Sequence, residues 1–283
     1  MLIRNAAARG AIWAVFGLLV LGLMASPVLI TLMLALARQW TSFLPSGVTG
    51  EHLGEALSAD SLASFSVSVQ TAVISSALAV LLGTWAALAG RSAPAWLRQP
   101  MSALFHLPSA IPSVVIGLGV LIAFSTPPLL LNGTPAIVVA VQTVMVLAFT
   151  YSNVHAALEG LDRQQALVAS SLGASPARIL LTVTLPQLLP SIGAAAGLSL
   201  ALCMGELGAT MMVYPASWRT VPVSIFTALD RGEVFLAAAM TLLLLLITLV
   251  ILALLALVRT GRGPARRGGG RRRAGKEGVG LAA

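Results

Sequence analysis

Residues 235–258, FLAAAMTLLLLLITLVILALLALV, decide the fold class of this chain, because they form an uninterrupted apolar run without a single charge. An α-helix rises about 1.5 Å per residue, so about 20 apolar residues cross the roughly 30 Å hydrocarbon core of a bilayer. The sequence therefore predicts an all-α integral membrane protein with about six transmembrane helices. The five other runs of this kind are 12–37, 66–89, one within 104–124, one within 135–154, and 191–213, which Glu206 interrupts.

The composition also indicates that the surroundings of this chain are largely lipid. Hydrophobic residues make up 58% of the 283 residues and charged residues only 9%, too few to cover a water-soluble globule. The net charge of +8 is local, because eight of the seventeen basic residues lie in the segment 259–276. Contact with anionic lipid headgroups explains such a segment better than RNA binding does, because it directly follows a span. We expect no nucleic-acid partner.

The distribution of basic residues predicts the direction of the chain in the membrane. Cytoplasmic loops carry an excess of Lys and Arg. With a cytoplasmic N-terminus and six crossings, fourteen basic residues lie inside and three, Arg38, Arg219 and Arg231, lie outside. We expect a multi-pass protein of the bacterial inner membrane with both termini in the cytoplasm. Its parts are a cytoplasmic N-terminus (1–11), a transmembrane domain (12–258) and a basic disordered cytoplasmic tail (259–283). The first run is longer than the apolar core of about 7–15 residues in a signal peptide, which favours a span.

The sequence predicts no catalytic or cofactor site within this chain. Its three histidines, His52, His106 and His155, show no metal-ligand spacing. No GxxxxGK[ST] phosphate loop occurs, so the chain does not bind ATP by that route. Any ATPase is therefore a separate polypeptide.

The segment 156–190, between the fourth and fifth runs, predicts two short helices joined by a sharp turn on the cytoplasmic side. Asp162 and Gln165 are spaced like a helix N-cap and its reciprocal partner, and Gly173 is typical of a helix C-terminus. Ser175 caps the second helix, and Pro186 is expected to interrupt it. The face of the first helix that carries Leu167, Val168, Ser171 and Leu172 is apolar. It either folds back onto the bundle or inserts into a groove on a soluble partner.

This segment resembles the EAA loop of binding-protein-dependent ABC importer permeases. The family pattern is Glu-Ala-Ala, three residues, Gly, nine residues, then Ile-x-Leu-Pro, and Ala169, Gly173 and Leu185-Pro186 match it in register. Leu167 stands where the family has Glu, and Val168 stands for the first Ala. The resemblance implies a type I ABC importer-like bundle whose coupling helix sits in a cleft of the ATPase. The residues that it assigns to this contact are Leu167, Val168, Ala169, Ser171, Leu172, Gly173, Ala174, Ser175 and Pro186.

The resemblance also implies partners that this chain does not contain. They are two ATPase subunits, which bind ATP and Mg²⁺, a second permease subunit, identical or homologous, and a periplasmic solute-binding protein. A lone six-helix chain without a nucleotide site energises nothing by itself. ATP-driven closure of the ATPase pair would move the coupling helices and switch the bundles between inward-open and outward-open states.

Two places inside the predicted spans are candidates for a translocation pathway or gate. Glu206 lies in the fifth run with Gly205 and Gly208 on either side, and intramembrane carboxylates usually face the bundle interior or a wet path. The alternative for Glu206 is a structural hydrogen bond to a neighbouring helix. Pro112, followed by Ser113, is expected to bend the third span, either as a packing solution or as part of a gate.

Residues after the fifth run suggest the kind of solute. The stretches GELGAT (205–210), WRTVPV (218–223) and DRG (230–232) resemble permeases of 2-aminoethylphosphonate importers, although iron, sulfate, thiamine and polyamine permeases share parts of them. Trp218 is either an anchor at the membrane interface or part of a docking surface for the binding protein. A secondary transporter would predict several intramembrane charges and an inverted repeat, and a membrane enzyme would predict clustered His, Asp or Ser residues. The sequence shows neither.

Overall fold

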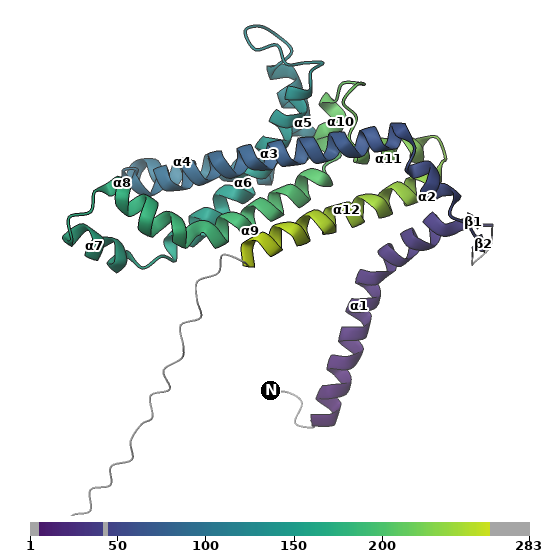
Figure 1. Cartoon of the computed structure of the whole chain (residues 1–283), viewed down its shortest axis with the longest axis horizontal. Coiled ribbons are helices and arrows are strands. Elements are labelled where there is room, and N and C mark those ends of the chain that lie inside the picture. The colour runs from purple at the N-terminus through teal and green to yellow at the C-terminus, as the bar shows by residue number, and fades with distance from the viewer. Residues whose placement is uncertain (1–5, 42–44, 261–283) are drawn as a thin grey trace, which may run out of the picture.

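The computed structural model describes residues 6–41 and 45–260, and it is a bundle of long helices (Figure 1). The long helix α3 (Ala59–Ser92) packs against α6 (Pro135–Glu159) and α9 (Leu185–Met204), and α12 (Val234–Thr260) lies against α9. The remaining elements are α1 (Ala6–Leu36), β1 (Ala37–Gln39), β2 (Ser46–Val48), α2 (Glu51–Ala56), α4 (Ala95–Ala110), α5 (Ser113–Ala123), α7 (Arg163–Ser171), α8 (Pro176–Ile179), the π-helical turn η1 (Leu180–Thr184), α10 (Gly208–Val213) and α11 (Val221–Asp230).

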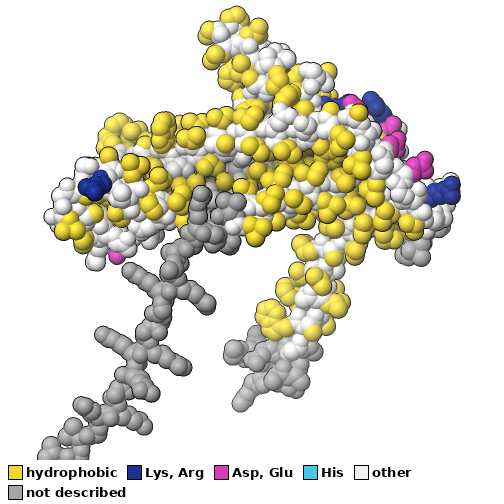
Figure 2. Space-filling view, in the orientation of Figure 1, with side chains coloured by type: hydrophobic (Ala, Val, Ile, Leu, Met, Phe, Trp, Pro, Cys, Tyr) yellow, Lys and Arg dark blue, Asp and Glu magenta, His cyan; other side chains and the backbone are white. Residues whose placement is uncertain are grey.

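The predicted all-α membrane fold is confirmed. Among the described residues, five helical stretches are long and apolar enough to cross a bilayer, and a bent helix pair brings the number to as many as six. The five are Ile12–Leu36, Ala59–Ser92, Pro135–Glu159, Pro176–Met204 and Val234–Leu257. Figure 2 shows the matching surface, on which apolar side chains cover the length of the bundle while charged side chains gather toward its two ends.

The third predicted span is not one straight helix. Its residues belong to α4 and α5, whose axes differ by 109° across the break at Ile111 and Pro112. Proline disfavours helical geometry in the residue before it, and both residues are extended, with ψ angles of 135° and 137°. The bend that Pro112 predicts is therefore a full corner in the chain.

The fifth predicted span, 191–213, also has different bounds. The helical stretch begins at Pro176 and ends at Met204, and residues 208–213 form the separate helix α10. Gly205 weakens the helix at this point, and Glu206 starts the next one by accepting a hydrogen bond from the backbone N–H of Ala209. Figure 1 shows α10 beside α5, with both helices standing out from the long bundle.

The polar segment predicted between the first two spans contains structure of its own. Strands β1 and β2 form an antiparallel pair in which Ala37 faces Val48 and Gln39 faces Ser46. Helix α2 follows and packs against α12. Helix α3 begins at Ala59, earlier than the predicted start of the second span at residue 66.

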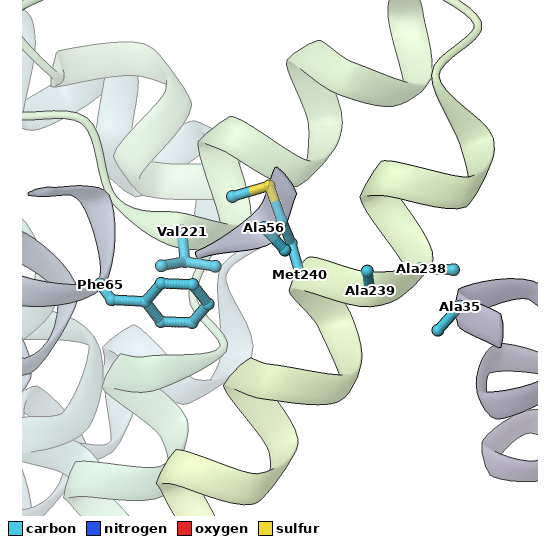
Figure 3. Close-up of a cluster of buried hydrophobic side chains, with 7 residues drawn as sticks. All are labelled: Ala35, Ala56, Phe65, Val221, Ala238, Ala239 and Met240. Carbon is cyan, nitrogen blue, oxygen red and sulfur yellow. The ribbon is translucent and has the colours of Figure 1, made fainter. Parts of the chain in front are cut away.

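Small side chains bring the helices together at the end of the bundle that carries α2 and α11. Figure 3 shows Phe65 of α3 beside Val221 of α11, and Ala238 of α12 turned toward Ala35 of α1. Alanines allow close approach of helix backbones, which is the usual way that membrane helices associate. Beyond this contact α1 diverges from the bundle (Figure 1), and its large apolar residues from Trp13 to Met24 are exposed.

The ends of the predicted domain division fall partly outside the described residues. Residues 1–5 and 261–283 lie there, and with them nearly all of the predicted basic tail. Helix α1 begins at Ala6, so helical structure extends into the segment predicted as the N-terminus, while the apolar part of α1 begins at Ile12.

Candidate functional site

The segment between α6 and α9 forms the predicted elbow of two short helices. Asp162 is the N-cap of α7, and its Oδ1 accepts a hydrogen bond of 2.9 Å from the backbone N–H of Gln164. The predicted helix start at Arg163 is therefore correct. Among the described residues the reciprocal bond from Gln165 is not formed, so the cap consists of Asp162 alone.

Gly173 ends α7 with a Schellman motif. The N–H of Ala174 donates to the carbonyl of Ala169 at 3.1 Å, and the N–H of Gly173 donates to the carbonyl of Ser170 at 2.9 Å. This arrangement requires a residue in the left-handed region, and Gly173 has a φ of +81°. A residue with a Cβ is strained there, so glycine fixes the turn between α7 and α8.

The second helix begins as predicted but does not end at Pro186. Ser175 caps α8 by accepting a hydrogen bond of 3.4 Å from the N–H of Arg178. The chain then passes through η1 into α9 without leaving helical geometry. A proline removes one helix hydrogen bond and crowds the carbonyl four residues earlier. The wider π-turn accommodates this change, because the N–H of Leu185 bonds to Leu180, five residues back.

The apolar face of α7 points away from the rest of the chain. Leu167, Val168 and Leu172 are 65%, 61% and 83% exposed, although all three are aliphatic. Ser171 does not add a free hydroxyl to this face, because its Oγ donates to the carbonyl of Leu167 at 3.0 Å. The structure therefore does not show the alternative in which this face folds back onto the bundle.

The pathway candidates meet where α5 crosses α10. Glu206 is half-buried in the break before α10, and its Oε1 accepts a hydrogen bond of 2.7 Å from the N–H of Ala209. Gly208 faces Ser113 so closely that a Cβ there would overlap the Ser113 hydroxyl. Pro112 starts α5 at this crossing, whereas Gly205 is exposed and makes no close contact across it.

Sequence reasoning missed two residues at this crossing. Gly117 lies against α10, where an added Cβ would stand 2.6 Å from the carbonyl oxygen of Ala209. Gln142 of α6 is fully buried and donates to the hydroxyl of Thr210 at 3.1 Å, while its Oε1 has no partner among the described residues. The sequence could have indicated Gln142, because it is a polar amide in the middle of the fourth apolar run.

A row of hydroxyls on α3, also missed, fixes α11 and the segment that leads into it. Ser64 bonds to Ser224 at 3.0 Å, Ser68 accepts from the N–H of Val221 at 2.7 Å, and Thr71 accepts from the indole of Trp218 at 2.9 Å. These positions recur every three or four residues and so share one helix face. Trp218 is thus bonded into the bundle. At the end of the row, Arg219 forms an ion pair of 2.7 Å with Asp60.

Comparison with known proteins gives the family. The sequence profile of the family described as "Binding-protein-dependent transport system inner membrane component" matches residues 79–262, from α3 to beyond α12. The chain belongs to this family. The match covers the elbow with α7 and the crossing of α5 and α10, so the chain is a membrane-spanning permease subunit and the resemblance seen in its EAA-like loop is confirmed.

Several relatives share most of this permease. A protein of Salmonella typhimurium provisionally named as the 2-aminoethylphosphonate transport system permease PhnV is 45% identical over 86% of this chain and 92% of its own length. A Salmonella choleraesuis protein with the same name is 47% identical over 77% of this chain and 82% of its own length. The molybdenum transport system permease protein ModB of Mycobacterium bovis is 32% identical over 56% of this chain and 66% of its own length.

Solved transporters share the fold of this permease. A chain of a bacterial ABC transporter that imports the acidic polysaccharide alginate superimposes with a TM-score of 0.67, covering 88% of this permease and 96% of that chain. A chain of the inward-facing methionine transporter MetNI gives a TM-score of 0.60, covering 74% and 100%. Both are 15% identical, so they support the bundle architecture alone.

Proposed function

We propose that this permease imports 2-aminoethylphosphonate or a related phosphonate across the bacterial inner membrane by alternating access. The observation that carries the transport mechanism is α7, a helix with three exposed aliphatic side chains, capped at both ends and joined to α9 through a glycine-fixed turn, while the solute rests on the sequence match. Apolar side chains at the end of a membrane bundle favour a protein partner that covers them.

That partner is a separate ATPase, which binds ATP and Mg²⁺ and seats α7 in an apolar cleft. Leu167 replaces the family's glutamate, so this contact relies on Leu167, Val168 and Leu172 rather than on a charged pair. The residues around the turn, Ala169, Ser171, Gly173, Ala174, Ser175 and Pro186, hold these side chains in place. Helix α8, η1 and α9 form one continuous helical stretch. A displacement of α7 therefore passes directly into a transmembrane helix.

The partners of the complete transporter follow from the orientation that the basic residues predict. The α7 end lies in the cytoplasm with both termini, and the end with α2 and α11 faces a periplasmic binding protein. A second permease subunit completes the path and packs against this one. The transmembrane domain is residues 12–258, with the basic segment 259–283 on the cytoplasmic side.

A phosphonate is favoured over the solutes of related permeases by the extent of the sequence match. The PhnV relatives match over most of the chain, whereas the molybdenum permease of Mycobacterium bovis matches just over half of it. We propose that the solute passes the crossing of α5 and α10, where Glu206, Gly208 and Ser113 lie together. Pro112 marks the break between α4 and α5, and Gly205 marks the break between α9 and α10.

Substitution of Leu172 by Asp tests the proposed contact between α7 and the ATPase. The change removes an apolar contact of about 2–3 kcal/mol and places a charge in the interface, so association weakens roughly a hundredfold. The matched control is Ser170→Asp, which adds the same charge to the last turn of α7 on another face. Co-purification from detergent measures the association. Equal recovery of the ATPase with both variants would contradict the proposal that the apolar face of α7 binds the ATPase.

Uptake by the reconstituted transporter tests the solute and the pathway. Proteoliposomes with the ATPase and binding protein should accumulate labelled 2-aminoethylphosphonate, and excess sulfate should not compete. Glu206→Gln keeps an oxygen that can accept from Ala209 but removes the charge, so it should slow uptake at equal expression. Wild-type uptake by this variant would show that the Glu206 charge plays no part in transport, and competition by sulfate would rule out a phosphonate-selective path.

A further inference from the structure

A pocket of about 290 Å³ lies at the same end of the bundle as α7, where α3 and α6 end and where α4 and α7 begin. Arg91 at the end of α3, Arg98 in α4 and Arg163 at the start of α7 all line it. Its one acidic residue, Glu159, lies 3.5 Å from the Nε2 of His155. The lining therefore carries an excess of positive charge contributed by three separate helices.

Of the three arginines, Arg98 is held in place by hydrogen bonds. Arg98 donates from Nε to the carbonyl of Ala93 at 2.8 Å and from Nη2 to the carbonyl of Arg91 at 3.2 Å. These bonds fix the guanidinium and leave its Nη1 without a partner among the described residues. A guanidinium fixed in this way loses little freedom when it binds a phosphate oxygen.

Tyr151 supplies a hydroxyl at the pocket. Its side chain is 1% exposed, and its ring is stacked on Phe105 at 4.7 Å and on His155 at 5.3 Å between ring centroids. The hydroxyl reaches Gly90, where an added Cβ would stand 3.8 Å from it, and both residues line the pocket. In the described part of the chain this hydroxyl makes no hydrogen bond. Because Tyr151 lines the pocket, its hydroxyl is available to bond to a ligand there.

We propose that this pocket binds a phosphate-type anion. Arginines are the residues best suited to phosphate oxygens, and the volume lies just below the roughly 300–1,000 Å³ range of small-molecule pockets, which suits a small anion. Two sources supply the same chemistry, the headgroup of an anionic lipid in the adjacent leaflet and a free phosphate or phosphonate in the cytoplasm. A bound anion links Arg163 at the start of α7 to Arg91 and Arg98, and so fixes the coupling helix against α3 and α4.

The purified full-length permease in lipid nanodiscs tests the proposal in two arms. In the first, nanodiscs containing phosphatidylglycerol are analysed by native mass spectrometry for lipid that stays bound. In the second, binding of radiolabelled inorganic phosphate is measured in pure phosphatidylcholine nanodiscs. The variants are Arg91→Gln, Arg98→Gln, Arg163→Gln and Tyr151→Phe. The matched control is Arg178→Gln, which removes an exposed positive charge from α8, outside the pocket.

Each arginine variant should weaken binding about tenfold or more, and Tyr151→Phe, which removes one oxygen, should weaken it less. If the wild type retains phosphatidylglycerol and the pocket variants lose it, the anion is a lipid headgroup. If the wild type binds phosphate saturably and the variants bind it more weakly, the anion is a free one. The proposal is overturned if neither anion binds or if the pocket variants behave like Arg178→Gln. In that case the arginines only stabilise the C-terminal ends of α3 and α6.

The cytoplasmic location of the pocket rests on the proposed function. The binding assay, however, requires neither the ATPase nor transport. A permease that binds the anion but imports no phosphonate would contradict the proposed solute and leave the pocket in place.

Discussion

The elbow with α7 and the segment that leads into α11 lie toward opposite ends of the bundle and are held in different ways (Figure 1). The elbow is fixed by its own sequence, through the Asp162 cap, the Gly173 turn and the Ser175 cap. Helix α11 and the segment before it are fixed by another helix, through bonds that Ser64, Ser68 and Thr71 of α3 accept. The first arrangement leaves an apolar face uncovered for a partner, and the second attaches the segment to the bundle.

The largest effect that separates the two regions is expected for Ser68→Ala. The N–H of Val221 loses its acceptor in a buried place, which should reduce the free energy of unfolding by about 1–3 kcal/mol. Thermal unfolding of the purified permease measures this loss. Ser66→Ala is the control, because the Ser66 hydroxyl accepts a bond from the exposed Gln70 and has no other partner among the described residues. Equal midpoints for both variants would show that the α3 hydroxyls do not stabilise this segment.

An intermediate effect is expected for Gly173→Ala, confined to the elbow. An alanine held at a φ near +81° costs about 1–2 kcal/mol, which should loosen the turn and speed amide hydrogen exchange in α7. The thermal midpoint of the bundle should stay unchanged, because α7 packs mainly on α8 and η1. Gly160→Ala, at a right-handed glycine, provides the matched control. A lowered midpoint with Gly173→Ala would mean that the elbow is part of the bundle's cooperative unit.

The smallest effect is expected for the ion pair between Arg219 and Asp60. The Asp60 side chain is 83% exposed, so solvent screens the pair and it contributes at most about 1 kcal/mol. A double-mutant cycle with Arg219→Gln and Asp60→Asn measures the coupling energy. A value well above this would make the ion pair, rather than the buried hydroxyls, the main attachment of the segment.

The sequence predicts features that depend on neighbouring residues and misses those that depend on distant ones. Asp162, Gly173 and Ser175-Pro176 act within one helical turn, and their predicted roles in the elbow are correct. The row of hydroxyls on α3 is invisible in the sequence, because Ser68 gains its meaning only from Val221, which is far away along the chain.

The breaks in the third and fifth spans show where composition alone is insufficient. A count of apolar residues gives the length of an apolar run but not the direction of the helix axis. It therefore joins α9 and α10 into one span across Gly205. Pro112 does predict a bend, but the size of the turn depends on how α5 packs against α10. Pro186 is misleading in the opposite sense. The local pattern predicts that the helix stops at this proline, but the π-helical turn η1 just before it lets the helix continue.

The contact between α5 and α10 restricts how this part of the molecule can deform. At Gly117 an added Cβ would stand 2.6 Å from the carbonyl oxygen of Ala209, so the backbones themselves leave no room there, whereas at Gly208 it would overlap the Ser113 hydroxyl. Both helices also pack on α6, so the three helices form one packed group. A larger residue at Gly117 would therefore disturb the contact of α5 with α10 and, through it, the packing of both helices on α6.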